Sequence, residues 1–190
     1  MNKQKIISYL QSIIAIPMFA IAMPLSGVSA IPDFTAITNT LASENSVIKT
    51  QEEVIREEKA EKIDTLLASY NSPLEGHGMK FVTEAEKQEI DWRLLVAIAG
   101  RESTFGKHPC KRVTNSFLGY GSCRINFESV DDAIEKVSAS LGGNDENTAH
   151  HYDGKTTLQI LRKYNSVIPN YPKEVVRIMK MIDDDGEKII

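Results

Sequence analysis

The sequence predicts a mainly α-helical fold, with a long charged helix followed by a compact helical domain. Apolar residues recur at helical spacing in several segments, and polar residues that favour helix starts stand before most of them. Segments typical of β-strands are sparse. A short β ribbon is an alternative only over residues 117–126, where glycines interrupt the pattern.

The first thirty residues have the pattern of a secretory signal peptide. Lys3 and Lys5 form a basic start, residues 13–25 are almost wholly apolar, and the triplet Val28-Ser29-Ala30 is a small-residue cleavage site. The apolar run is short for a membrane span and contains two prolines. We expect residues 1–30 to be removed, leaving no stable membrane span and a secreted or periplasmic protein. An uncleaved signal anchor is the alternative.

The charge balance argues against nucleic acid as a partner. The chain carries 22 Lys and Arg residues and 26 Asp and Glu residues. Loss of Lys3 and Lys5 with the signal peptide leaves a net charge of −6. Phosphate binding needs a basic face, and simple adhesion to an anionic wall or membrane fits an acidic protein poorly. A substrate of that kind must be held by a groove.

Two cysteines, Cys110 and Cys123, predict one intramolecular disulfide in an exported protein. The closed loop is short, so its stabilisation is on the order of 3 kcal/mol. Its main expected effect is to fix the loop that follows Glu102. A reduced structural pair is the alternative.

The mature chain divides into three parts by composition. Residues 31–43 are rich in Thr, Ser and Ala and read as a flexible tether. Residues 44–70 lack Gly and Pro and are highly charged, which predicts a solvated helix whose C-terminal part docks on the domain and which could mediate self-association. Residues 71–190 form the compact domain, opening with a loop of helix breakers.

Within the compact domain, local polar patterns predict five helix starts. The predicted starts are the Thr83–Glu86 pair, Asp91, the Ser129–Asp132 pair, the Thr156–Gln159 pair and Pro172. Gly142-Gly143 predicts the end of the helix that begins after Ser129.

Glu102 is the most informative residue of the chain. At helical spacing it lies on one face with Leu95, Ile98 and Ala99, in the last turn of a helix that Gly106 can stop. Partial burial and the negative end of the helix dipole both disfavour a charged carboxyl there. A carboxyl kept protonated near neutral pH suits a general acid for glycosidic cleavage. The alternative is a solvated Glu at a helix end.

Three features in this order resemble lysozyme-like lytic transglycosylases. The run from Gly100 to Gly106 resembles their catalytic-Glu motif, in which Glu-Ser ends a helix and Phe-Gly follows. The loop from Asn115 to Gly121 resembles the Asn-x-Phe-Gly loop of the related glucosaminidase group, and Tyr164-Asn165 resembles the Ala-Tyr-Asn motif. The resemblance covers about residues 74–182 and implies a lysozyme-like α domain.

The resemblance implies cleavage of peptidoglycan between N-acetylmuramic acid and N-acetylglucosamine. Glu102 would protonate the glycosidic oxygen and later take a proton back, giving a 1,6-anhydro sugar. This scheme needs one carboxylate, whereas most glycosidases use two. Asp91, Glu128, Asp131 and Asp132 are better explained as helix-start charges; one of them facing Glu102 would favour hydrolysis.

The same resemblance supplies the candidate substrate-binding residues. They are Ser103, Asn115, Phe117, Tyr120, Tyr164 and Asn165. Ser103 could instead cap local backbone. Tyr120 could stack on a sugar or lie on the surface, and Tyr164 could donate its hydroxyl toward Glu102 or be an ordinary half-buried tyrosine. Asn165 could contact substrate or hold its loop through backbone hydrogen bonds. No cofactor is implied, and no metal is expected because His150-His151 lacks a third ligand at a known spacing.

Two departures from the family pattern support other hypotheses. Gly119-Tyr120-Gly121-Ser122 stands where lytic transglycosylases usually carry Gly-Leu-Met-Gln, and Lys163 replaces the Ala before Tyr164. One alternative is therefore a glycan-binding module that has lost turnover. The other is a structural envelope protein that associates through residues 44–70.

Overall fold

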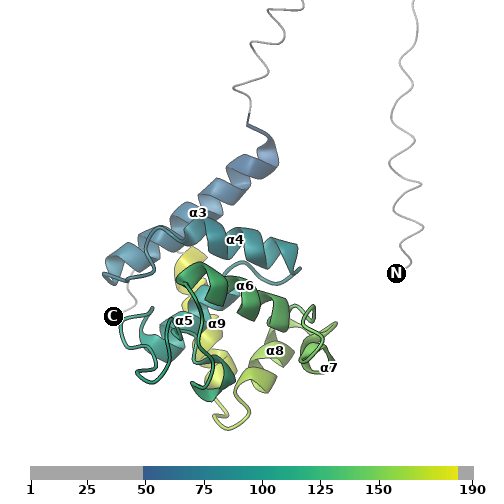
Figure 1. Cartoon of the computed structure of the whole chain (residues 1–190). Helices are drawn as coiled ribbons and strands as arrows, with labels where there is room; N and C mark the ends of the chain where they lie inside the picture. Colours follow the sequence, from purple (N-terminus) through teal and green to yellow (C-terminus); the bar gives the residue numbers. More distant parts are fainter. Residues whose placement is uncertain (1–48, 184–190) are drawn as a thin grey trace, which may run out of the picture. The chain divides into compact units, whose positions relative to one another are not determined.

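The computed structural model describes residues 49–183, which fold mainly as α-helices. The predicted signal peptide, the tether and the first residues of the predicted charged helix lie outside this range. Seven α-helices and one 3₁₀ turn occur between residues 49 and 183, and this range contains no β-strand (Figure 1). The elements are α3 (Gln51–Ser69), α4 (Gly78–Lys87), α5 (Leu94–Ser103), the 3₁₀ turn η1 (Tyr120–Ser122), α6 (Val130–Leu141), α7 (Ala149–Tyr152), α8 (Thr157–Tyr164) and α9 (Tyr171–Asp183).

Helix α3 is charged along most of its length and docks through its C-terminal half. Thr50 caps it: the Thr50 hydroxyl accepts from Glu53 N at 3.2 Å, and Glu53 accepts from Thr50 N at 2.8 Å. Ile63 and Leu67 are fully buried in the core, whereas Val54 and Ile55 in the N-terminal half are exposed. Helix α3 lies beside α4 (Figure 1). Self-association through this helix stays a prediction.

The start predicted at Thr83 is wrong, because α4 begins five residues earlier at Gly78. Thr83 lies inside the helix, and its hydroxyl donates to Met79 O at 2.9 Å. The cap comes from another helix: Asp64 Oδ1 of α3 accepts from Gly76 N at 2.9 Å and from Gly78 N at 3.0 Å. A cap supplied by tertiary contact leaves no local sequence pattern.

Helix α5 is the centre of the core. Its first six residues are all buried, and it packs against α9. Asp91 is not its N-cap, because Arg93 occupies that position. Asp91 Oδ1 accepts from Arg93 N at 3.0 Å and the Asp91 carbonyl accepts from Leu94 N at 3.0 Å, so Asp91 closes a turn just before the helix.

The later helix boundaries agree with the sequence. The Ser129 hydroxyl accepts from Asp132 N at 3.0 Å at the start of α6, and Gly142 caps its end. Gln159 accepts from Thr156 N at 2.9 Å at the start of α8. Pro172 lies in the first turn of α9.

The segment between α5 and α6 forms neither helix nor ribbon over most of its length. Residues 117–126 contain η1 in place of the candidate ribbon. Asn115, Gly119, Gly121, Ser122 and Cys123 all have positive φ, which an extended strand does not allow. In the part of the chain the structure covers, no helix combines the length and apolar character needed to cross a membrane.

Candidate functional site

Glu102 lines a cavity of about 590 Å³. The cavity lies between the end of α5, the loop that holds η1, helix α7 and the end of α8. Its lining residues are Glu102, Ser103, Cys110, Ser116, Gly119, Tyr120, Gly121, Ser122, Cys123, Ile125, Thr148, His151, Tyr152, Tyr164 and Asn165. Its volume falls within the range of about 300–1,000 Å³ that is usual for small-ligand sites.

Glu102 is the penultimate residue of α5 and is half-buried. Gly119 of the facing loop lies directly against it: a Cβ at this glycine would stand 2.7 Å from Glu102 Oε2. Gly119 also has a φ of +68°, in the left-handed region that favours glycine. The loop therefore approaches the carboxylate as closely as a backbone without a side chain allows.

A tight turn fixes the end of α5 just after Glu102. Thr104, Phe105 and Gly106 have φ values of +52°, +54° and +80°. The Ser103 hydroxyl donates to Ala99 O at 3.0 Å and accepts from Gly106 N at 2.8 Å. The buried hydroxyl of Ser72 donates to Phe105 O at 2.7 Å, a support that sequence reasoning missed. Ser103 lines the cavity, but its hydroxyl is engaged by backbone.

No second acid among the described residues lines the cavity with Glu102. Asp91 binds Arg93 in the turn before α5. The Asp131 carboxylate contacts His77 Nδ1 at 2.7 Å, and Asp132 pairs with Lys136 at 2.9 Å. Glu128 is exposed outside the cavity lining. The site therefore presents one carboxylate, the number that the transglycosylase scheme needs.

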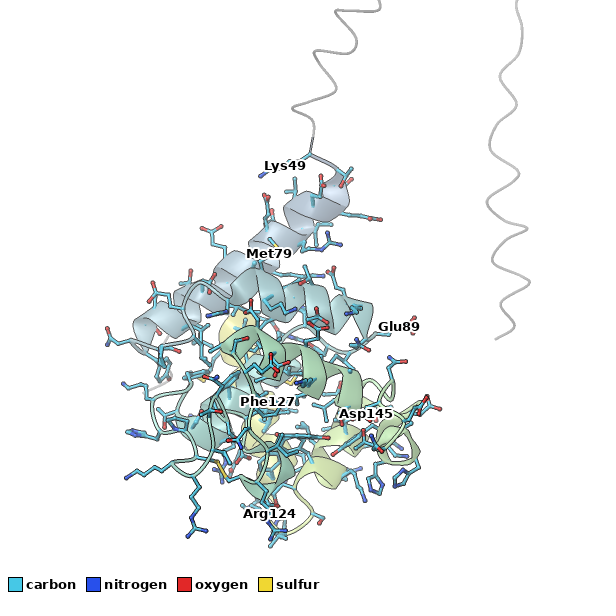
Figure 2. All side chains as sticks on the ribbon, in the orientation of Figure 1. Lys49, Met79, Glu89, Arg124, Phe127 and Asp145 are labelled. Atoms are coloured by element: carbon cyan, nitrogen blue, oxygen red, sulfur yellow. A yellow bond between two sulfur atoms is a disulfide. The ribbon has the colours of Figure 1, made fainter. Side chains whose placement is uncertain are left out.

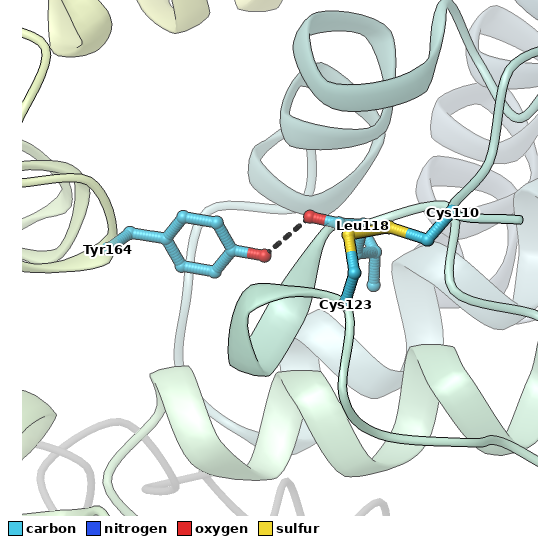
Figure 3. The surroundings of a disulfide bond; sticks show 4 residues. All are labelled: Cys110, Leu118, Cys123 and Tyr164. Atoms are coloured by element: carbon cyan, nitrogen blue, oxygen red, sulfur yellow. Dashed lines mark hydrogen bonds between the residues drawn. A yellow bond between two sulfur atoms is a disulfide. The ribbon is translucent and has the colours of Figure 1, made fainter. Parts of the chain in front are cut away.

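The hydroxyl of Tyr164 donates to the carbonyl oxygen of Leu118 at 2.7 Å (Figure 3). The expected donation toward Glu102 is therefore wrong for this conformation, because the carbonyl of the facing loop takes the proton. Burial raises the pKa of Tyr164 well above its ordinary value, and nearby Tyr171 and Glu102 add to the rise. Tyr164 lines the cavity and stays a neutral donor that holds the chain just before Gly119.

Tyr171, the first residue of α9, is a second tyrosine near Glu102 that sequence reasoning missed. Its ring stacks on Tyr164 with centroids 6.1 Å apart, and the Arg101 guanidinium lies 5.9 Å from its centroid. Its buried hydroxyl makes no hydrogen bond of normal geometry with the described residues. Burial raises the pKa of Tyr171, and the negative charge of Glu102 adds to the rise. In the sequence, Tyr171 is marked only by its position at the start of the apolar face of α9.

Tyr120 and Asn165 also line the cavity. The Tyr120 hydroxyl shares a 2.6 Å hydrogen bond with Ser140 Oγ of α6, which in turn lies 2.8 Å from Thr148 Oγ1. The Tyr120 ring remains partly exposed to the cavity. Asn165 Oδ1 accepts from Val167 N and Ile168 N at 3.2 and 3.0 Å, so this oxygen holds the loop after α8.

Asn115 and Phe117 are not brought into the cavity lining. Asn115 Nδ2 donates to Phe127 O at 3.0 Å. Phe117 is buried and packs edge-on against Phe81, with ring centroids 6.4 Å apart. Both residues therefore stabilise the loop that holds η1 without lining the cavity.

Cys110 and Cys123 form the predicted disulfide, and both line the cavity. Figure 3 shows this bond beside Leu118, with Tyr164 on the other side of the loop. A covalent link and a tyrosine hydroxyl thus hold the same short stretch. The disulfide is compatible with an exported protein.

His151 of α7 also lines the cavity. Burial lowers its pKa, and the positive charges of His150, Lys163 and Lys155 lower it further. The rings of His150 and His151 lie 3.7 Å apart. Between residues 49 and 183, no group of three or more His, Cys, Asp or Glu side chains is arranged to hold a metal ion.

No protein-family model, curated protein or solved structure matches the chain. The resemblance to lysozyme-like lytic transglycosylases therefore stays a prediction that its motifs carry. The chemistry has to be argued from the cavity itself.

Proposed function

We propose that the protein is a peptidoglycan-cleaving glycosidase that uses Glu102 as its one catalytic carboxyl. The observation that carries this proposal is the position of Glu102, a half-buried acid at a helix end. Among residues 49–183 it is the sole acid that lines the cavity of about 590 Å³. A concave site with a single acid suits a reaction in which one group gives and later recovers a proton.

The proposed reaction is an intramolecular transglycosylation. Protonated Glu102 gives its proton to the glycosidic oxygen between N-acetylmuramic acid and N-acetylglucosamine as the C1–O bond breaks. The 6-hydroxyl of the muramic acid attacks the resulting oxocarbenium-like C1, and Glu102 takes the proton of that hydroxyl. The products are a 1,6-anhydro end and a free 4-hydroxyl, and no water is consumed.

The surrounding residues have roles in positioning and contact. The backbone at Gly119 lies close to Glu102 Oε2 and leaves no room for a side chain there. The exposed part of the Tyr120 ring offers an apolar wall on which a sugar ring can pack. Tyr164 donates a hydrogen bond to the Leu118 carbonyl and so fixes the position of the backbone next to Gly119. Ser103 fixes the end of α5.

The test is incubation of mature protein with purified peptidoglycan, followed by mass spectrometry of the soluble fragments. We expect anhydro-terminated fragments from the wild type and a loss of about 1,000-fold in Glu102→Gln. Glu128→Gln, which changes an exposed acid outside the cavity, is the matched control and should leave the rate unchanged. Products with reducing ends would assign the site to a hydrolase, and equal rates for both variants would refute a catalytic role for Glu102.

A non-catalytic glycan-binding module is the second candidate. Two observations favour it: the loop facing Glu102 reads Gly119-Tyr120-Gly121-Ser122, unlike the family pattern, and the Ser103 hydroxyl is engaged by backbone. In that case the protein would co-sediment with peptidoglycan without releasing fragments, and Glu102→Gln would bind as well as the wild type.

A further inference from the structure

Positive charge is concentrated in two segments of the described chain. Residues 103–127 contain Lys107, Lys111, Arg112 and Arg124 and no Asp or Glu. Residues 154–173 contain Lys155, Arg162, Lys163 and Lys173, again without an acid. The rest of residues 49–183 holds 11 Lys and Arg residues against 21 Asp and Glu residues. The net acidity of the protein therefore lies outside these two segments.

Both segments form walls of the Glu102 cavity. Lys111 follows Cys110, and Arg124 stands between Cys123 and Ile125; these three neighbours all line the cavity. The disulfide brings the two stretches together, with 5.8 Å between the Cα atoms of its cysteines. Lys163 precedes the lining residue Tyr164 on the other wall. We call Lys111, Arg112, Arg124, Lys155 and Lys163 the cationic rim.

The rim cations are exposed and available to a ligand. Lys111, Arg112 and Arg124 make no ion pair with any residue between 49 and 183. Several cations elsewhere are paired: Arg56 pairs with Glu86 at 2.8 Å, for example. Figure 2 shows Arg124 at the end of the described domain remote from Lys49.

The field of the rim reaches the cavity wall. Lys155 and Lys163 lower the pKa of His151, a lining residue, after the larger effects of its burial and of His150. Burial alone would lower this pKa, and the added effect of Lys155 and Lys163 shows that two rim cations lie near this wall. The cavity thus combines one carboxyl, that of Glu102, with positive charge on the neighbouring segments.

We propose that the cationic rim binds carboxylates of the peptide stems, so that the substrate is glycan that still carries its peptides. This inference rests on the proposed function. Glycan without peptides, with its lactyl carboxyls blocked as neutral amides, offers the rim no anion, whereas each peptide stem of peptidoglycan brings free carboxylates close to the sugar that is cleaved. Lysine and arginine side chains bind such carboxylates by charge-assisted hydrogen bonds.

The test measures binding without turnover, in the Glu102→Gln background. Peptidoglycan with its peptides is compared with the same glycan after an amidase has removed them and the freed lactyl carboxyls have been converted to neutral amides. The rim variant is Lys111→Gln/Arg112→Gln/Arg124→Gln. The control, Lys136→Gln/Arg177→Gln/Lys180→Gln, removes three charges from α6 and α9, outside the two basic segments.

At about 50 mM salt we expect the rim variant to bind peptide-bearing glycan about tenfold more weakly than its parent, and at about 300 mM salt the difference should shrink because the charges are screened. On stripped glycan the rim variant should bind like its parent, and the control variant should bind normally to both. Equal weakening on stripped glycan, or equal weakening in the control, would overturn the proposal.

The two proposals fail in different ways. If the wild type releases no fragment from either glycan, the glycosidase proposal fails, while the binding comparison still decides whether the rim recognises peptides. If the wild type releases anhydro fragments and the rim variant binds both glycans like its parent, only the rim proposal fails.

Discussion

The helical body and the cavity loop are held together by different means. The body, which comprises α3, α4, α5 and α9, is ordered by fully buried apolar side chains such as Ile63, Leu67 and Ile98. The cavity loop, residues 104–129, has one 3₁₀ turn, several residues of positive φ, a disulfide and a few side-chain-to-backbone hydrogen bonds. It is anchored in the same core by four buried side chains, those of Phe105, Phe117, Leu118 and Phe127. The body therefore sets stability, and the loop sets the shape of the site.

This contrast makes the two regions separable by mutation. Loss of apolar volume in the body should lower stability while the reaction products stay the same. Small changes at loop positions that carry no buried apolar side chain should alter activity at little cost to folding, because they leave the packing of the core intact.

The largest effect on stability is expected in the body from Leu67→Ala. Leu67 is fully buried in the core, so its truncation should cost about 3 kcal/mol of unfolding free energy. Urea denaturation followed by circular dichroism measures this cost. Ile55→Ala, on the exposed half of the same helix, is the control and should cost less than about 0.5 kcal/mol. Similar costs at both positions would remove the distinction between the two halves of α3.

Gly119→Ala should have the largest effect in the loop. The new Cβ would lie 2.7 Å from Glu102 Oε2 at a φ of +68°, so both the backbone and the carboxylate must move. We expect glycan cleavage to fall about 100-fold, with a loss of about 1 kcal/mol in stability. Gly154→Ala has a similar φ of +64° with no atom within 4 Å, and it isolates the backbone strain from the contact with Glu102. Equal activity in the two variants would contradict a role for this close approach.

Tyr164→Phe should have a smaller effect, confined to the loop. It removes the 2.7 Å hydrogen bond to Leu118 O and leaves the ring stacking on Tyr171 in place. The expected cost is about 1 kcal/mol of stability, with about a tenfold fall in kcat as the loop near Glu102 loosens. The kinetics of fragment release and thermal melts measure the two quantities. A fall in stability without any change in kcat would show that this hydrogen bond serves only folding.

Asp91→Asn should have the smallest effect, and that effect should depend on pH. Burial alone would raise the pKa of Asp91, but hydrogen bonds from Arg93 outweigh it and hold the pKa below its ordinary value. A lowered carboxyl pKa adds stability above the unfolded pKa of about 4, and this stability is lost as the pH falls through the folded value. The wild type should exceed Asp91→Asn by about 1 kcal/mol at pH 7, and the gap should close near about pH 3. A stability difference that grows as the pH falls would show that the pKa of Asp91 is raised, not lowered, in the folded protein.

The sequence predicted the body better than the loop, for physical reasons. Ser129, Thr156 and Pro172 act on their own backbone, so local patterns located α6, α8 and α9. The start of α4 was misplaced because its cap, Asp64, comes from a different helix. Local patterns carry no information about a partner supplied by another element.

The sequence identified several residues of the site but few of the contacts that they make. The position of Glu102 at a helix end follows from periodicity, and the disulfide follows from the cysteine count. The Tyr164–Leu118 bond, the support from Ser72 and the position of Tyr171 depend on how distant segments meet. Asn115 and Phe117 match the motif, yet the positive φ of Asn115 and the burial of Phe117 direct both residues toward structural contacts.

The separation of charge between the two basic segments and the rest of the domain gives the described part a large permanent dipole moment. Residues 103–127 and 154–173 carry eight positive charges, while the remaining described residues carry a net charge of −10. Beyond a Debye length of about 10 Å, salt screens the charges, so a polyanionic surface repels this acidic protein only weakly. Closer in, its field exerts a torque on that dipole and turns the mouth of the cavity toward the surface.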